Sequence, residues 1–139
     1  MEISNKIPFS NPKFKNGLEP FQHKIVKDVL ESRKKIVMIN APTGSGKSPI
    51  GMTLAHHLNY PNQSLYLCSS KILQDQLAGD FTEAYRLKGR GNYPCTLLPT
   101  YNADRCFQQC EEYRIGDIPC AYEDAKREAL SSTFTILNM

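Results

Sequence analysis

The segment Ala41-Pro-Thr-Gly-Ser-Gly-Lys-Ser48 combines two glycines, a lysine and a hydroxyl side chain at spacings that suit phosphate chemistry. Gly44 and Gly46 let the backbone bend until successive N–H groups converge on a phosphate, and the helix expected after them adds partial positive charge. Lys47 would reach the β- and γ-phosphates of ATP, and the Ser48 hydroxyl would ligate Mg²⁺. The predicted site for ATP and Mg²⁺ comprises Ala41, Pro42, Thr43, Gly44, Ser45, Gly46, Lys47 and Ser48.

A second candidate site consists of four cysteines that cluster in the later part of the chain, namely Cys95, Cys106, Cys110 and Cys120. Four thiolates are a ligand set for either Zn²⁺ or an iron–sulfur cluster. The spacing Cys-x10-Cys-x3-Cys-x9-Cys lacks the Cys-x2-Cys pairs that are typical of zinc ribbons. The spacing therefore predicts a metal centre with four cysteine ligands and leaves the metal open. The fifth cysteine, Cys68, lies in an apolar segment and is expected in the core.

The elements that would position these residues alternate between strands and helices. Apolar residues recur at helical spacing after Pro20, and short runs rich in Ile, Val and Leu are typical of buried strands. Strand–helix–strand alternation predicts an α/β fold with a parallel sheet. The expected strands are 34–40, 64–69 and 133–137, and the expected helices begin at Pro20 and span 47–58, 71–77 and 122–130.

The chain of 139 residues is long enough for one domain, within which composition changes mark four parts. We expect an irregular lead-in at 1–19 and the first part of a nucleotide-binding domain at 20–88. A Cys-rich insertion at 89–121 and a return toward the sheet at 122–139 follow.

Composition excludes some classes of protein. No apolar run approaches the roughly 20 residues of a membrane span, and none near the start resembles a secretory signal. We therefore expect no membrane partner and a cytoplasmic location, or a nucleoid or nuclear one. The net charge of +3 permits a polyanionic partner without requiring one.

With both sites in view, residues from Phe21 to Asn138 resemble the start of a DinG- or XPD-like iron–sulfur DNA helicase of superfamily 2. Gln22 stands where such helicases have the glutamine that reads adenine, and Ala commonly begins their phosphate loop. Residues 65–76, LYLCSSKILQDQ, look like motif Ia, which contacts the DNA backbone. Residues 87–95, LKGRGNYPC, match the approach to the first cluster ligand, and Cys120-Ala-Tyr122 resembles the last.

The resemblance implies a partial RecA-like P-loop NTPase domain with an iron–sulfur insertion. The four clustered cysteines would hold a 4Fe-4S cluster, although the middle pair is separated by three residues where two is common. Ser69, Ser70 and Lys71 of the motif Ia turn would contact DNA, and Lys88 and Arg90 are further candidates for phosphate binding. The complete enzyme would use ATP to move along single-stranded DNA and to open duplex junctions.

Two parts of such a motor are not found in this sequence. Glu111-Glu112 and Glu123-Asp124 do not follow an apolar strand, so we identify no acidic box and no catalytic residue beyond Lys47. The second RecA-like domain is missing too. We expect a fragment of a longer helicase, inactive by itself, rather than a truncated gene product. The alternatives are a zinc-binding, nucleic-acid-dependent ATPase and a module that binds nucleotide or DNA without catalysis.

Overall fold

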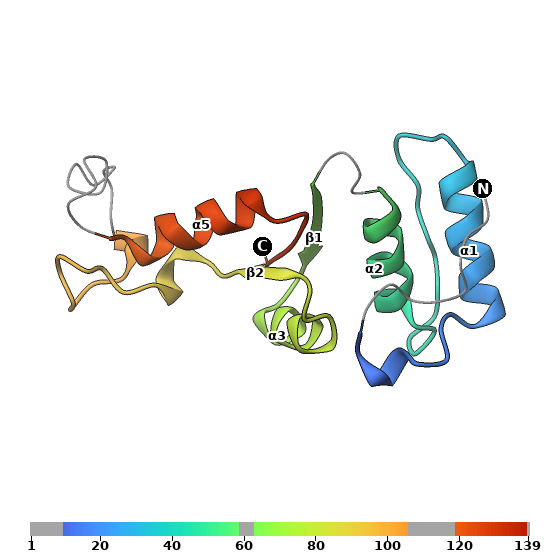
Figure 1. Cartoon of the computed structure of the whole chain (residues 1–139), viewed down its shortest axis with the longest axis horizontal. Helices are drawn as coiled ribbons and strands as arrows, with labels where there is room; N and C mark the ends of the chain where they lie inside the picture. The colour runs from blue at the N-terminus through green and yellow to red at the C-terminus, as the bar shows by residue number, and fades with distance from the viewer. Residues whose placement is uncertain (1–9, 59–62, 106–118, 139) are drawn as a thin grey trace.

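The structure, a computed structural model, describes residues 10–58, 63–105 and 119–138 and contains a small parallel β-sheet (Figure 1). Its strands are β1 (Ser64–Cys68), β2 (Tyr85–Leu87) and β3 (Phe134–Asn138), in the order β1-β3-β2. Ser64 aligns with Phe134, and Tyr85 aligns with Thr135. The strand that comes last in the sequence therefore occupies the middle of the sheet.

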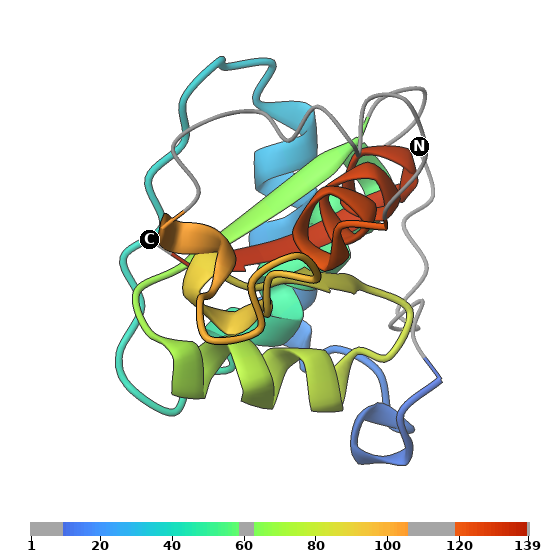
Figure 2. The same cartoon turned by 90° about the vertical axis from the view of Figure 1, so that its left-hand side faces the viewer.

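Four α-helices flank this sheet and its approach: α1 (Pro20–Glu31), α2 (Lys47–Leu58), α3 (Lys71–Asp80) and α5 (Ala121–Ser131). Helices α2 and α3 supply apolar side chains to the face that carries Phe134 and Ile136. Helix α5 lies on the opposite face, where the Thr135 hydroxyl donates to the Ala129 carbonyl (Figure 2). None of the helices in the described ranges is long and apolar enough to cross a membrane.

The main core joins the sheet to α2 and α3 through Met52, Leu77, Phe81, Phe134 and Ile136, which are all buried. Helices α1 and α2 meet in a second cluster of Leu18, Val26, Ile50 and Leu54. The lead-in takes part as well, because Phe14 stacks on Phe81 with ring centroids 5.0 Å apart. The phosphate-loop helix α2 thus belongs to both clusters, which fixes its position relative to α1 and to the sheet.

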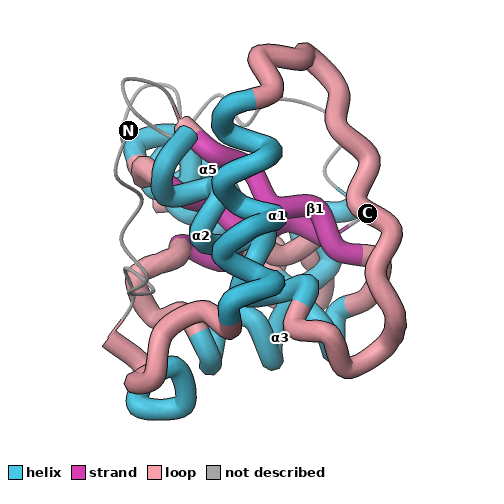
Figure 3. Tube along the Cα trace, turned by 90° about the vertical axis from the view of Figure 1, so that its right-hand side faces the viewer, coloured by secondary structure: helices cyan, strands magenta, loops and turns pink. Residues whose placement is uncertain are grey.

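The predicted strand at 34–40 is wrong. This segment is an irregular connection between α1 and α2, drawn as loop in Figure 3. The side chains of Ile36 and Met38 are 88% and 92% exposed. A strand that is apolar on both faces is stable only with neighbours on both edges and both faces, and within the described residues no other strand pairs with it. Its apolar sequence therefore reflects burial that this chain does not supply.

The remaining expected elements are present, with boundaries that shift by one to three residues. Strand β2 was missed because it has only three residues and Arg86 lies at its centre, so neither an apolar run nor alternation announces it. The expectation for Cys68 is confirmed, since its side chain is only 3% exposed and packs in the main core.

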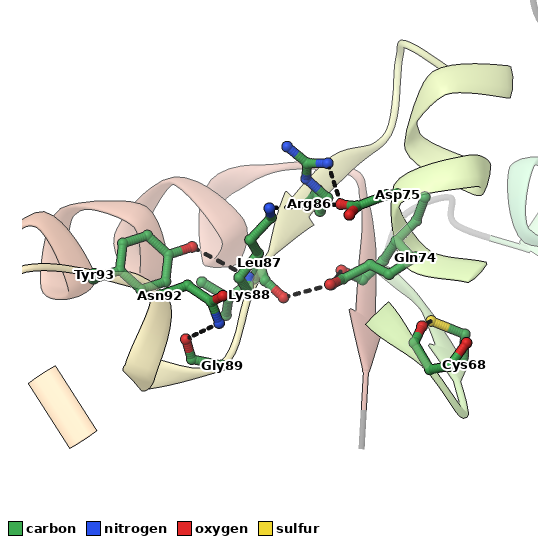
Figure 4. A network of polar contacts seen from close by, with 11 residues as sticks. Cys68, Gln74, Asp75, Arg86, Leu87, Lys88, Gly89, Asn92 and Tyr93 are labelled. Carbon is green, nitrogen blue, oxygen red and sulfur yellow. Dashed lines mark hydrogen bonds and ion pairs between the residues drawn. The ribbon is translucent and has the colours of Figure 1, made fainter. Parts of the chain in front are cut away.

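A buried glutamine of α3 ties the sheet together at its carboxyl edge. Gln74 is fully buried, and its Nε2 donates to the carbonyl of Leu87 at 2.7 Å and to that of Ile136 at 3.0 Å (Figure 4). These carbonyls belong to β2 and β3, so one side chain holds two neighbouring strands. Beside it, the Cys68 thiol donates to the Leu137 carbonyl at 3.1 Å.

We predict that Gln74→Ala lowers the free energy of unfolding by about 2–4 kcal/mol, because it leaves two strand carbonyls without their donor and opens a cavity. Urea denaturation measures this loss. The matched control is Gln76→Ala on the same helix, where the side chain is exposed and a change within about 0.5 kcal/mol is expected. Equal losses in the two variants would contradict the role of Gln74.

Candidate nucleotide-binding site

The loop from Ala41 to Gly46 forms a tight turn that leads directly into α2 at Lys47. Gly44 and Gly46 adopt φ angles of +82° and +76°, a region that residues with a side chain rarely occupy. The first N–H groups of a helix have no partners within the helix and carry partial positive charge. A glycine turn that ends on such a helix start is an arrangement suited to binding a phosphate group.

Gln22 holds this loop against α1. Its Nε2 donates to the Ser45 carbonyl at 3.0 Å, and its Oε1 accepts from the Glu19 N–H at 2.9 Å, with the side chain only 8% exposed. Both ends of the amide are thus engaged by backbone. The structure brings Gln22 to the site, as the resemblance implies, while its contact with adenine stays a prediction.

Lys47 curls back over the entrance of the loop. Its Nζ donates to the carbonyls of Ala41 at 3.0 Å and Pro42 at 2.8 Å, and the Ser45 hydroxyl also donates to Pro42 at 2.8 Å. The Lys47 side chain remains exposed. Its ammonium group can therefore exchange two neutral carbonyl partners for a phosphate, which is a stronger acceptor because it is charged.

Ser48 follows in the first turn of α2, where the Tyr66 hydroxyl of β1 contacts it. Burial raises the pKa of the Tyr66 phenol, and a hydrogen bond with Ser48 partly opposes that rise. Tyr66 is a site residue that sequence reasoning missed. Its position in an ordinary apolar strand gave no signal, because only the packing of β1 under α2 brings it to the loop.

The cysteine segments lie apart from the phosphate loop, beyond β2. Cys95 and Cys120 are partly buried free thiols, and the Thr96 hydroxyl donates to the Pro119 carbonyl at 2.7 Å. The residues that adjoin the first and last candidate ligands are therefore in contact, as a shared metal centre requires. Cys106 and Cys110 lie outside the described residues. Among those described, no three His, Cys, Asp or Glu side chains gather into a metal site.

Aromatic rings connect the two cysteine segments. Tyr93 and Tyr122 lie edge to face with ring centroids 5.6 Å apart, and the Arg90 guanidinium lies 5.2 Å from the centroid of Tyr122. The Tyr93 hydroxyl accepts from the Lys88 N–H at 3.1 Å. These contacts order the start of the Cys-rich segment without a metal, and they engage Arg90, one of the candidate phosphate binders.

The candidate DNA-binding residues gather where strands end. Ser69, Ser70 and Lys71 follow β1 and are exposed, and Lys88 follows β2. Strands β1 and β2 both run parallel to β3, so their carboxyl ends share one edge of the sheet. The Ser70 hydroxyl also caps α3 by accepting from the Leu73 N–H at 3.2 Å.

An acidic side chain sits beside these basic residues. Asp75 lies one helical turn after Lys71 and forms an ion pair with Lys88 at 3.6 Å. Arg86 contacts the same carboxylate. Lys71 and Lys88 thus lie on one side of the molecule, and DNA would meet Lys88 already paired.

A parallel α/β fold in which a glycine turn feeds a helix start defines the class of P-loop nucleotide-binding domains. A family model described as the type III restriction enzyme, res subunit, matches residues 15–132, and the chain belongs to this family. The match supports a helicase-like domain of superfamily 2, and the small parallel sheet with flanking helices fits a partial RecA-like domain. No curated protein and no solved structure matches the chain significantly.

We predict that alanine is tolerated less at Gly46 than at Gly44. Both substitutions force a side chain into positive φ, which costs roughly 1–2 kcal/mol. A Cβ at Gly44 meets nothing within 4 Å, whereas one at Gly46 lies 2.2 Å from Nε2 of Gln22. Gly46→Ala should therefore lose about 1 kcal/mol more in the free energy of unfolding, because the hydrogen bond from Gln22 to Ser45 is displaced.

Denaturation of Gly46→Ala in a Gln22→Ala background provides the control. Without the glutamine amide, the cost of Gly46→Ala should fall to that of Gly44→Ala. A cost at Gly46 that does not depend on Gln22 would show that the two residues are not coupled.

Proposed function

We propose that this chain is the ATP-binding portion of the motor of an iron–sulfur DNA helicase. The observation that carries the proposal is the turn from Ala41 to Ser48, with two glycines at positive φ and a lysine already placed over the loop. ATP phosphates would occupy the helix start, Lys47 would bind their terminal oxygens, and Ser48 would hold Mg²⁺. The match to a helicase-like family supports this assignment.

The proposed complete motor includes polypeptide that lies against the exposed apolar segment near the loop. Ile36 and Met38 are almost fully exposed, and Leu65 and Leu67 of the edge strand β1 are 58% and 55% exposed. Exposed apolar groups on two neighbouring extended segments favour burial by additional strands or helices. In a helicase these would bring the acidic box and the second RecA-like domain, which hydrolysis requires. We therefore expect binding of ATP without turnover by this chain alone.

We predict that Lys47→Ala lowers the affinity for Mg-ATP by about tenfold or more, since charge-assisted hydrogen bonds to phosphate are lost. The fold should persist, because Lys47 is exposed and contacts only loop carbonyls. Isothermal titration calorimetry measures the change. Lys24→Ala serves as the control, as it removes an exposed lysine of α1 that pairs with Asp28. Equal affinities of Lys47→Ala and the wild type would refute the phosphate loop.

The cysteines are proposed as ligands of a 4Fe-4S cluster. The contact between Thr96 and Pro119, together with the partly buried thiols of Cys95 and Cys120, supports a common centre for the two segments. Such a cluster would hold the Cys-rich insertion in one conformation, because this stretch has few apolar residues of its own. Zn²⁺ on the same thiolates is the alternative, and elemental analysis distinguishes the two.

We predict that anaerobically purified protein contains iron and acid-labile sulfide, and that replacing any one ligand by serine removes both together with the visible absorption. The variants are Cys95→Ser, Cys106→Ser, Cys110→Ser and Cys120→Ser. Cys68→Ser is the matched control, because its thiol is buried in the main core and should affect only stability. Stoichiometric zinc without sulfide would replace the cluster by a zinc site, and metal loss from Cys68→Ser would mean that the ligand set is wrong.

Single-stranded DNA is proposed to pass the carboxyl edge of the sheet. The exposed turn of Ser69, Ser70 and Lys71 and the neighbouring Lys88 and Arg90 would bind successive phosphates. Backbone contacts of this kind are independent of base sequence and sensitive to salt.

We predict that Lys71→Ala combined with Arg90→Ala reduces the slope of log affinity against log salt by about 0.7 for each lost phosphate contact. Fluorescence anisotropy with a labelled oligonucleotide across a salt series measures the slope. Lys24→Ala combined with Lys27→Ala removes the same charge from α1 and should affect the slope less. Equal slopes for the two double variants would place the DNA path elsewhere.

A further inference from the structure

Tyr66 reaches the phosphate-loop helix from the strand beneath it. It lies on β1 and packs against the main core from its margin. A Cβ built on Gly51 of α2 would stand 2.9 Å from Cε2 of Tyr66 and 3.6 Å from its hydroxyl. The ring therefore lies directly on the helix backbone, in space that only a glycine at position 51 leaves open.

This packing directs the Tyr66 hydroxyl toward Ser48. Gly51 follows Ser48 by three residues, so the two share one face of α2. The hydroxyl of Tyr66 is hydrogen-bonded to the Ser48 side chain, and this bond lowers the pKa of the phenol against the effect of burial. A donated hydrogen bond favours the phenolate, so Ser48 is the donor and the tyrosine oxygen is the acceptor.

The direction of this bond matters for cation binding. A serine hydroxyl has one hydrogen to donate and two lone pairs that accept or ligate. When the hydrogen is held by a neighbouring acceptor, the lone pairs point away from that neighbour and are available to a cation. Lys47 does not compete for this hydroxyl, because its ammonium group is placed over the carbonyls of Ala41 and Pro42.

We propose that Tyr66 is a positioning residue for Ser48: by accepting the serine hydrogen, it orients the Oγ lone pairs toward the Mg²⁺ of a bound Mg-nucleotide. The inference rests on the proposed nucleotide site. It assigns to β1 a part in metal binding, since this strand fixes the tyrosine ring on which the orientation depends. Tyr66 itself contacts neither Mg²⁺ nor phosphate.

The test compares ATP affinities in excess Mg²⁺ and in EDTA. The gain in affinity on adding Mg²⁺ should fall about three- to tenfold in Tyr66→Phe, which corresponds to the loss of one hydrogen bond. The affinity in EDTA should stay as in the wild type, because phenylalanine preserves the ring that packs on Gly51. Unchanged EDTA affinity also reports that the variant is folded.

A double-mutant cycle separates positioning from general packing. Ser48→Ala should remove most of the Mg²⁺ gain, and Tyr66→Phe added to it should cost nothing further. Tyr85→Phe is the matched control, since its hydroxyl bonds Glu128 on the other face of the sheet and its loss should leave the Mg²⁺ gain intact.

Three outcomes would overturn the inference. One is an equal loss in Mg²⁺ and in EDTA, which indicates packing alone. Another is an unchanged Mg²⁺ gain in Tyr66→Phe. A wild-type chain that binds ATP in neither condition would overturn the proposed nucleotide site itself, and the inference with it.

Discussion

The structure depends on the insertion of β3 between β1 and β2. Each outer strand pairs with β3 in parallel, so the sheet closes only when the last described element returns to the middle. Gln74 depends on the same event, because it donates to one carbonyl of β2 and one of β3. The return also brings α5 back across the sheet, and with it Cys120 toward Cys95. One non-local pairing therefore sets both the core and the geometry of the Cys-rich segment.

The phosphate loop is held from its sides rather than from a strand that precedes it. Gln22 binds the loop carbonyl of Ser45, and Tyr66 supports the first turn of α2 from below. Helix α2 in turn shares buried residues with both core clusters. The loop thus keeps a phosphate-binding shape although residues 34–40 are irregular and exposed. Additional polypeptide on those residues would complete the sheet without having to create the loop.

Much of this arrangement was predictable from local sequence. Helical periodicity identified α1 and α2, and the alternation of elements gave a parallel α/β sheet. The strand at 34–40 was wrong because an apolar pattern records how a segment is buried, and the neighbours that would bury it are not part of this chain. Short β2 and the placement of Tyr66 escaped for the opposite reason, since both are set by tertiary packing. The loop glycines were predictable because their chemistry is local.

Hydrogen–deuterium exchange of the wild-type chain with and without saturating Mg-ATP tests the central claim, that the glycine turn and the start of α2 form a nucleotide site. The account predicts slower exchange at the amides of residues 44–48, whose N–H groups would face phosphate. Strand β2, on the far edge of the sheet, should exchange at the same rate in both states. Unchanged exchange at 44–48, or protection confined to other segments, would contradict the claim.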